Sequence, residues 1–367
     1  FNSQRSYAMW PDRRLIKLFG IEHPILLAPM AGPSTPELCV AVSEAGGLGS
    51  FACALATPEQ IRTALSIIRQ RTNKPINLNF FTHKPPLPDP DREAKWRARL
   101  ASYYSELGLD PNAEVPNTNR MPFDETTCQI VEEFKPEVVS FHFGLPEEGL
   151  LQRVKATGAK VISSATTAQE AKWLADRGCD AIIAQGAEAG GHRGMFLTDN
   201  IASQAGTFAL VPQIVDAVDV PVIAAGGIAD GRGIAAAFAL GASGVQIGTA
   251  YLFCPEAKVS ELHRNALRSA RDDDTVLTNV FTGRPARGVI NRIVRELGPL
   301  SPDAPAFPLA AGALAPIRAA AEAKGSADFT SLWSGQSASL GREMPAGDLT
   351  RTLAQEALDR LKALAGN

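Results

Sequence analysis

The sequence predicts an α/β protein whose main part is a (β/α)8 barrel, or TIM barrel. Two observations favour this fold class. Eight short apolar runs alternate with amphipathic stretches long enough to form helices, and strands joined through helices pair in parallel. Most neighbouring runs also begin 20 to 28 residues apart, the length of one strand–helix unit. An open, doubly wound sheet is the second choice. The eight predicted strands are Ile25–Ala28, Leu48–Phe51, Ile76–Asn79, Val138–Phe141, Val161–Ser163, Ala181–Ala184, Val222–Ala225 and Val245–Gly248.

The composition is that of a globular protein with a sizeable core. Of the 367 residues, 45% are hydrophobic and 20% are charged. The formal net charge of −3 provides no basic field for nucleic acid or an anionic membrane surface, so we expect a small-molecule substrate. No apolar run approaches the roughly 20 residues that span a bilayer, and there is no signal-peptide pattern. A cytoplasmic protein, monomeric or homodimeric, is predicted.

Cysteines and histidines give no sign of a metal site. The cysteines are odd in number and scattered without a Cys-x-x-Cys pair, which predicts neither a disulfide framework nor a zinc cage and fits a reducing compartment. They are Cys39, Cys53, Cys128, Cys179 and Cys254. His23, His83 and His263 lack metal-like spacing, so no metal is predicted. Met9 resembles a natural start, and residues 1–8 are set aside.

Capping signals place helices behind several of the strands. Thr57 is followed by proline, Thr167 precedes a helix-forming stretch, and Asp230 precedes an alanine-rich run. The first strand leads directly into Ala28–Gly32, which contains one soft apolar side chain, Met30, suited to packing against a flat ring. These signals agree with strand–helix units throughout the barrel.

Two connections are longer than the rest, and both leave the carboxyl end of a strand. The third strand is followed by an insertion, residues 82–122, with proline-rich ends and a helix-permissive centre from Arg92 to Leu107. In barrels, functional insertions collect at this end of the strands. The insertion is expected to be either a lid over the barrel mouth or a surface excursion, with equal weight.

The second long connection carries the strongest candidate for catalysis. Ala184–Gly194 is a glycine-rich segment that follows a buried strand and contains His192. Glycines such as Gly190 and Gly191 let the backbone lie close against a flat ligand, while an imidazole that titrates near neutrality can act as a base. His192 is therefore the predicted catalytic residue, although a solvated loop histidine is the more common reading of such a pattern without further context.

Two further glycine loops predict a phosphate site. Gly226 and Gly227 leave the seventh strand, and Gln246–Thr249, which includes Ile247 and Gly248, leaves the eighth. Barrels often hold a phosphate between these loops on backbone N–H groups, although Gly-Gly alone could simply turn the chain. A phosphate here and a histidine from the sixth strand predict flavin mononucleotide (FMN). Asn79 and Gln185 end two strands and could bond the polar edge of the flavin ring.

The rest of the chain is assigned outside the barrel. The barrel is predicted to span 9–275, a smaller appendage on the substrate side 276–340, and a C-terminal helix packed on the barrel 341–367. His142 ends the fourth strand and is the candidate for substrate contact, with a satisfied rim histidine equally favoured.

These residues resemble a known family, the nitronate monooxygenases, formerly called 2-nitropropane dioxygenases. The likeness runs from Pro24 to about Leu364. It rests on six motifs: Ala28-Pro29-Met30-Ala31-Gly32, Asn77-Leu78-Asn79-Phe80, Ser140-Phe141-His142-Phe143-Gly144, Gln185 through Gly194, Ala225-Gly226-Gly227-Ile228 and Gln246-Ile247-Gly248-Thr249.

The resemblance implies an FMN barrel in which His192 is the catalytic base. It also implies that Asn79, Gln185, Gly190, Gly227 and Gln246–Thr249 line the cofactor. The family oxidises alkyl nitronates with O2, releasing nitrite and a carbonyl compound. Phe281–Gly288 and Leu332–Gln336 resemble the class that contains bacterial enzymes active on propionate 3-nitronate.

Two alternatives stay open. Flavin-dependent enoyl-acyl-carrier-protein reductases and quinone reductases, which use NADH or NADPH, share the fold, the flavin and the His192 loop. The insertion and the appendage favour the nitronate class over these compact reductases. A flavin-binding barrel without turnover is the second alternative, and the intact histidine loop counts against it.

Overall fold

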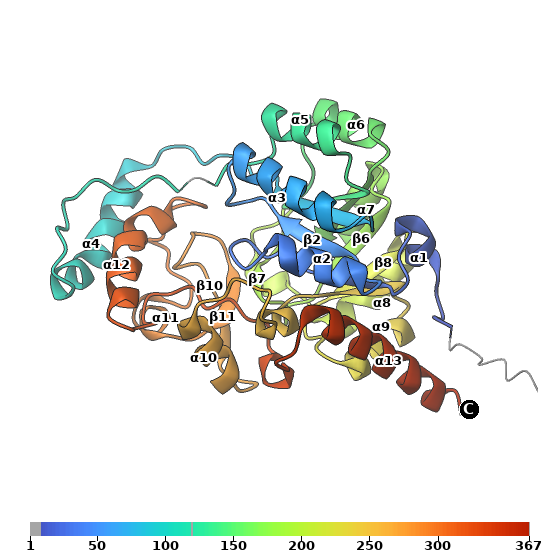
Figure 1. The fold of residues 1–367 in the computed structure, drawn as a ribbon. Coiled ribbons are helices and arrows are strands. Elements are labelled where there is room, and N and C mark those ends of the chain that lie inside the picture. Colours follow the sequence, from blue (N-terminus) through green and yellow to red (C-terminus); the bar gives the residue numbers. More distant parts are fainter. Residues whose placement is uncertain (1–8, 119, 367) are drawn as a thin grey trace, which may run out of the picture.

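The structure is a computed structural model that describes residues 9–118 and 120–366. Residues 1–8, which were set aside above, lie outside the described part of the chain. Figure 1 shows two parts: a barrel surrounded by helices and, at one end of it, a group of helices and short strands.

Eight parallel strands form the barrel, which confirms the predicted fold class. Their order is β1-β9-β8-β6-β5-β4-β3-β2. A parallel bridge between Leu26 and Leu48 connects the two ends of this order, β1 and the start of β2. The strands are β1 (Ile25–Leu27), β2 (Gly49–Ala52), β3 (Ile76–Phe81), β4 (Val138–His142), β5 (Lys160–Ala165), β6 (Ala181–Gln185), β8 (Val222–Ala225) and β9 (Gly244–Ile247). All eight coincide with predicted apolar runs, because strands buried on both faces are continuously apolar.

Helices cover the outside of the barrel, and their starts follow the predicted caps. The Thr57 hydroxyl accepts from the N–H of Gln60 at 3.2 Å, and Thr167 caps the helix after β5 in the same way. These outer helices are α1 (Arg14–Phe19), α2 (Pro36–Glu44), α3 (Pro58–Arg71), α5 (Glu125–Phe134), α6 (Glu148–Ala156), α7 (Ala168–Asp176), α8 (Thr207–Ala217), α9 (Gly231–Ala239) and α13 (Ala346–Leu364). The last of them, α13, packs on α2 and α9.

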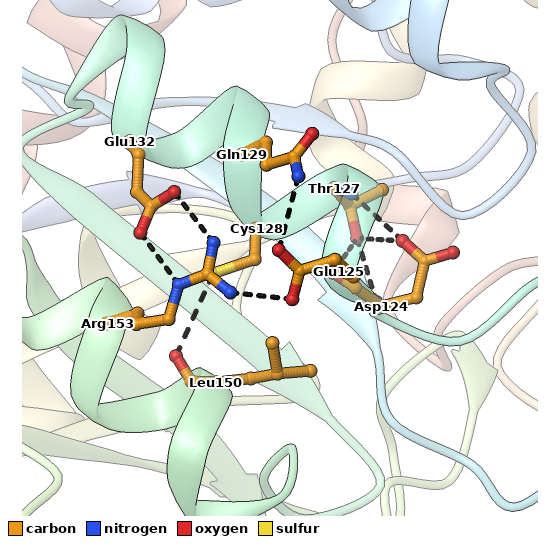
Figure 2. Close-up of polar contacts among 8 residues, drawn as sticks. All are labelled: Asp124, Glu125, Thr127, Cys128, Gln129, Glu132, Leu150 and Arg153. Carbon is orange, nitrogen blue, oxygen red and sulfur yellow. Dashed lines mark hydrogen bonds and ion pairs between the residues drawn. The ribbon is translucent and has the colours of Figure 1, made fainter.

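Arg153 joins α5 to α6 where the chain returns from the insertion to the barrel. Its Nε donates to Glu132 at 2.8 Å and its Nη1 donates to Glu125 at 2.6 Å, as Figure 2 shows. The guanidinium lowers the pKa of both carboxyls, although exposed pairs of this kind contribute little to stability. This is the normal environment of a surface arginine, with carboxylates on both sides of the guanidinium.

The insertion and the appendage pack together outside the barrel, and we refer to residues 82–122 and 276–340 as the cap. Helix α4 (Pro90–Glu106) lies beside α12 (Ala310–Ala323) in Figure 1. Trp96 Nε1 donates to the Ala310 carbonyl at 3.1 Å, and the Tyr104 hydroxyl donates to the Ala313 carbonyl at 2.6 Å. Aromatic residues of α4 thereby share one hydrophobic cluster with the appendage, separate from the core around the barrel strands. The division into 9–275, 276–340 and 341–367 stays a prediction.

A small antiparallel sheet connects the cap to the barrel. It consists of β10 (Thr275–Thr278), β11 (Ala286–Val289) and β7 (Gly191–His192), in the order β10-β11-β7. His192 pairs with Ala286, so the segment expected to be a loop contributes a two-residue strand. The other elements are α10 (Glu261–Ser269), α11 (Arg292–Leu297) and the short 3-10 helices η1 (Ile201–Ser203), η2 (Thr249–Phe253) and η3 (Ala338–Leu340).

Some properties of the whole chain bear on the class of site. Residues 9–118 and 120–366 contain no helix long and apolar enough to cross a membrane. Within the same residues, no group of three or more metal-binding side chains is arranged to hold an ion. All five cysteines are free and buried.

Candidate active site

His192 lies where the barrel mouth meets the cap. Its Nε2 is 2.8 Å from the Thr282 hydroxyl, which the appendage supplies. Aromatic rings surround the imidazole: the ring centroids of Phe307 and Trp333 are 5.3 and 5.5 Å away, and those of Phe81 and Phe143 are both 6.2 Å away. The pairing of β7 with β11 therefore places the predicted base under residues that are distant in sequence.

This environment keeps His192 neutral. Burial is the largest influence and holds its pKa well below 6.5, and the positive charges of Arg120 and Arg284 act in the same direction. A buried imidazole without a carboxylate partner prefers the uncharged form. At neutral pH the ring therefore has one nitrogen lone pair available to accept a proton.

Gln185 and His142 hold the backbone of the His192 loop. Gln185 Nε2 donates to the His192 carbonyl at 2.9 Å, and the Gln185 side-chain oxygen accepts from the N–H of Gly194 at 2.7 Å. His142 Nε2 lies 3.1 Å from the same carbonyl, and its Nδ1 lies 3.0 Å from the Ser164 hydroxyl. Burial lowers the pKa of His142 to about 4, so it too is neutral. His142 was predicted to contact the substrate, but both of its ring nitrogens are thus already within hydrogen-bond distance of protein atoms.

The remaining polar and apolar candidates occupy the ends of β1, β3 and β9. Asn79 Nδ2 donates to the Ser140 hydroxyl at 3.0 Å. Met30 lies near Gly248, where an added Cβ would come within 3.7 Å of the Met30 sulfur. Gln246, at the end of β9, has a buried side-chain oxygen with no hydrogen-bond donor in the described chain. Such an orphaned acceptor is costly in a native protein unless a ligand or water pairs with it.

The predicted phosphate loops present backbone donors that the protein does not use. The N–H groups of Gly226, Gly227 and Gly248 donate to no acceptor in the described residues. Gly226 and Gly227 have φ angles of 113° and 73°, in the left-handed region that favours glycine. Convergent free N–H groups at the ends of neighbouring strands are the usual form of an anion site. The residues present therefore fit a phosphate-bearing cofactor.

The cap closes over these loops. Thr249 Oγ1 accepts from the N–H of Gly335 at 2.9 Å, and the Ser337 hydroxyl donates to the Gly227 carbonyl at 3.0 Å. The backbone of Gly190 lies so close to that of Gly335 that a Cβ at position 190 would be 2.5 Å from the Gly335 nitrogen. Residues 335–337 thus contact all three glycine loops.

The structure also brings functional candidates to the site that the sequence analysis did not identify. They are Thr282, Arg284, Phe307 and Trp333 from the appendage, and His83 and Arg120 from the insertion. His83 was considered only as a metal ligand, and its ring lies 4.8 Å from that of Phe307. Thr282, Arg284 and Trp333 stood in motifs singled out for their resemblance, and no spacing signal placed the other three beside His192.

An eight-stranded parallel barrel with a neutral imidazole and unpaired N–H groups at the carboxyl ends of its strands defines a class: a (β/α)8-barrel enzyme whose site lies at the mouth of the barrel. The family model described as nitronate monooxygenase matches residues 12–356. A nitronate monooxygenase from Pseudomonas aeruginosa is 43% identical over 346 residues, covering 94% of this chain and 98% of that protein. One from Paraburkholderia phytofirmans is 41% identical and covers 96% and 97%.

Solved structures agree with the sequence comparison. A nitroalkane oxidase from Streptomyces ansochromogenes superposes with a TM-score of 0.88 at 37% identity, covering 96% of this chain and 99% of that one. FabK from Thermotoga maritima gives a TM-score of 0.70 at 31% identity, covering 96% and 98%. The chain belongs to the nitronate monooxygenase family. It is accordingly a nitronate-oxidising monooxygenase, and that family is flavin-dependent.

Proposed function

We propose that this protein is an FMN-dependent monooxygenase that oxidises alkyl nitronates, propionate 3-nitronate among them, with O2 to a carbonyl compound and nitrite. The observation that carries the proposal is the neutral imidazole of His192 at the barrel mouth, beside the unpaired N–H groups of Gly226, Gly227 and Gly248. A base and an anion cradle at one barrel mouth are the two parts that such a reaction needs.

FMN is the flavin that this cradle fits best. Its phosphate would accept hydrogen bonds from Gly227, Gly248 and Thr249, and the buried oxygen of Gln246 would accept from the flavin. Gly190, Gly191, Gly226 and Ile247 would supply close backbone walls, with Met30 against the ring. The bound flavin would accept electrons from the substrate and pass them to O2.

His192 has two tasks in this proposal. With a neutral nitroalkane, its lone pair removes the acidic α-proton to give the nitronate. With a nitronate supplied directly no proton has to be removed, and the ring acts in the other tautomer or in its charged form, either of which presents an N–H donor to the anion. His142, Gln185 and Asn79 would act at a distance from the reacting atoms or at the flavin edge, because their nitrogens already bond to Ser140 or to the His192 loop. A direct substrate contact by His142 stays a prediction.

His192→Asn is the variant that tests the proposal. Asparagine keeps a donor but removes the base, so turnover of a neutral nitroalkane should fall by about 10² to 10⁴, the usual contribution of a general base, while preformed nitronate is less affected. Oxygen uptake on both substrate forms measures this. His23→Asn, a histidine that contacts Trp10 instead of the site, is the control and should change neither rate.

The cofactor is tested on the same preparations. Heat-released chromophore identified by chromatography should be FMN in the unaltered protein and in both variants. Recovery of FAD, or of no flavin after reconstitution, would remove the phosphate-site argument. Equal small losses on both substrate forms in His192→Asn would mean that the base lies elsewhere.

A reductase is the second candidate, because FabK has a similar fold at 31% identity. Anaerobic mixing with NADH or NADPH separates the two functions, since rapid bleaching of the flavin indicates a reductase. For a nitronate monooxygenase, bleaching is expected with nitronate instead. The expectation that the cap separates the two functions is wrong, because FabK covers 96% of this chain, most of the cap included; the 43% identity to a nitronate monooxygenase is what favours the second outcome.

A further inference from the structure

Two guanidinium groups lie beside the ring cluster of His192, one from each part of the cap. Arg284 Cζ is 3.9 Å from the ring centroid of Phe143, and Arg120 Cζ is 5.7 Å from that of Phe307. These two rings are 5.6 Å apart, and both flank the imidazole. Each guanidinium is therefore one aromatic ring away from the predicted base.

Neither guanidinium has a carboxylate partner. Within the described residues, Arg120 and Arg284 form no ion pair, whereas Arg153 on the barrel surface is paired with two glutamates (Figure 2). Arg284 donates one hydrogen bond, to the Met195 carbonyl. Both groups are half-buried, and burial lowers the pKa of each to about 10. A half-buried arginine that the protein leaves unpaired has donors free for an anion from outside.

The charged groups nearby do not neutralise this pair. Glu170 exerts an attraction on Arg284, but its carboxylate already accepts from the N–H groups of Thr166 and Phe196 at 2.6 and 2.7 Å. Arg318 also repels Arg120, although it is itself paired with Glu322, its Nε lying 3.8 Å from that carboxylate. His83, between the rings, is neutral and has a buried Nδ1 without a partner. The region is therefore cationic and contains unused polar atoms.

We propose that Arg120 and Arg284 together bind a carboxylate that the substrate carries at the end opposite its nitronate. This inference rests on the proposed function and assigns the specificity of that same site. A guanidinium matches a carboxylate with two parallel N–H donors, and the aromatic faces hold each fork in place. The nitronate end would lie at His192 and the carboxylate end under the cap, joined by a short aliphatic chain across the rings.

The proposal makes substrate choice a property of the cap. Arg120 lies in the insertion and Arg284 in the appendage, more than 160 residues apart, and the two segments are brought together by the packing of α4 on α12 and by contacts such as the hydrogen bond from the Tyr103 hydroxyl to Glu296. An alkyl nitronate without a carboxylate would still reach His192, but it would leave both guanidinium groups unpaired.

Arg120→Gln and Arg284→Gln test the pair against two substrates, propionate 3-nitronate and propyl nitronate, which lacks the carboxylate. In each variant we expect kcat/KM for propionate 3-nitronate to fall about 10- to 100-fold, mainly through KM, as for loss of one partner of a buried charge pair. Propyl nitronate should change much less, because it loses no contact with the arginines and responds only to the removal of a positive charge near His192, so the ratio of the two kcat/KM values is the diagnostic quantity. Arg→Lys at either position should retain part of the preference.

Arg177→Gln is the matched control. Arg177 Cζ is 3.8 Å from the Trp173 ring and its Nη1 donates to the Trp173 carbonyl, so it makes the same stacking contact, but it is exposed on the outside of the barrel. Neither substrate should be affected. Succinate, a dicarboxylate without a nitro group, should inhibit the unaltered protein competitively and inhibit the double variant Arg120→Gln/Arg284→Gln weakly.

The outcomes separate this inference from the function on which it rests. No oxygen uptake with either nitronate in the unaltered protein would overturn both. Turnover of both nitronates with equal losses in the arginine variants, at unchanged flavin content and thermal midpoint, would overturn the carboxylate site alone. Inhibition by succinate that persists in the double variant would do the same.

Discussion

The two sides of the site are built in different ways. On the barrel side, the polar groups without a partner in the described residues are the backbone N–H donors of Gly226, Gly227 and Gly248, together with the Gln246 oxygen. On the cap side they are side chains, namely rings and guanidinium groups from segments far apart in sequence. A backbone cradle is specified by a few neighbouring glycines, whereas a side-chain wall depends on how distant segments pack.

The difference predicts a division of labour. We expect the barrel side to bind the cofactor and to recognise the reacting group, which every substrate has. The cap side recognises what distinguishes one substrate from another. Changes on the barrel side should therefore abolish every activity, and changes on the cap side should alter rate or preference while the flavin stays bound.

Gly227→Asp should have the largest effect, which is a loss of flavin binding on the barrel side. The new side chain would occupy a left-handed position with φ of 73°, its Cβ 3.3 Å from that of Glu188, and would place a carboxylate beside the expected phosphate. We expect flavin affinity to fall roughly 100-fold from charge repulsion in a site of moderate dielectric. Fluorescence titration of the released and rebound flavin measures it.

Gly227→Asn separates charge from size. Asparagine has nearly the same shape as aspartate and tolerates positive φ, so the loss should be about tenfold or less. Full flavin occupancy in the aspartate variant would place the phosphate elsewhere. Equal losses in the two variants would mean that the approach of the backbone matters more than the charge.

The sequence predicted the barrel side better than the cap side, for a physical reason. Strand–helix repeats fix which strand ends are neighbours, so Gly227 and Gly248 could be placed together without knowing any tertiary contact. The antiparallel pairing of His192 with Ala286 carries no local signal, since a two-residue strand is too short to show periodicity. The insertion was likewise ambiguous because its helix buries Trp96 against α12 instead of against its own neighbours.

Residues Thr282, Phe307 and Arg120 show the same limit. Phe307 and Arg120 are ordinary in their local sequence, Thr282 was noticed only as part of a motif without a role, and all three come to lie beside His192 only when the cap packs. His192 itself was predicted as a base from its glycine-rich surroundings, while its hydrogen bond to Thr282 and the burial that keeps it neutral belong to the cap. Local glycine patterns predicted where the free N–H groups lie at the strand ends, whereas packing decides what surrounds His192.

Acid should destabilise both sides of the site, the barrel side through His142 and the cap side through His83. Burial lowers the pKa of His83 to about 4, below the value of about 6.5 expected in the unfolded chain. The unfolded state then binds more protons than the folded state, so stability is full above pH 6.5 and falls as pH decreases toward 4. For one such histidine the loss between pH 7 and pH 5 is about 2 kcal/mol.

His83→Leu tests this assignment by urea unfolding at the two pH values with saturating flavin. The variant keeps an apolar side chain among Phe81, Phe143 and Phe307 but cannot bind a proton. Its loss of stability between pH 7 and pH 5 should be smaller than that of the unaltered protein by about 2 kcal/mol. The same pH dependence in both proteins would mean that His83 is protonated freely in the folded state.

Thr282→Val should have the smallest effect. Thr282 belongs to the cap and is hydrogen-bonded to His192, so it connects the two sides of the site. The Thr282 hydroxyl can donate to the Arg284 carbonyl at 3.4 Å and accept from His192 Nε2 at 2.8 Å, which leaves the lone pair of the ring on Nδ1. Valine removes this acceptor while keeping the shape, so the ring loses one orienting hydrogen bond and its basicity decreases. We expect turnover of a neutral nitroalkane to fall about tenfold, the value of one net hydrogen bond, with preformed nitronate and flavin content unchanged.

Two companion variants determine whether the hydroxyl acts as a positioning group. Thr282→Ser restores the hydroxyl and should recover the rate and the pH profile. Thr278→Val removes a buried threonine hydroxyl from the same segment, one that donates to the Pro299 carbonyl, and should lower stability without moving the pH profile. If the serine variant were as slow as the valine variant, packing of the threonine methyl would be the cause. If both rates fell equally in Thr282→Val, the hydroxyl would serve the nitronate directly, and the cap would then supply a binding group to the reaction itself as well as selecting the substrate.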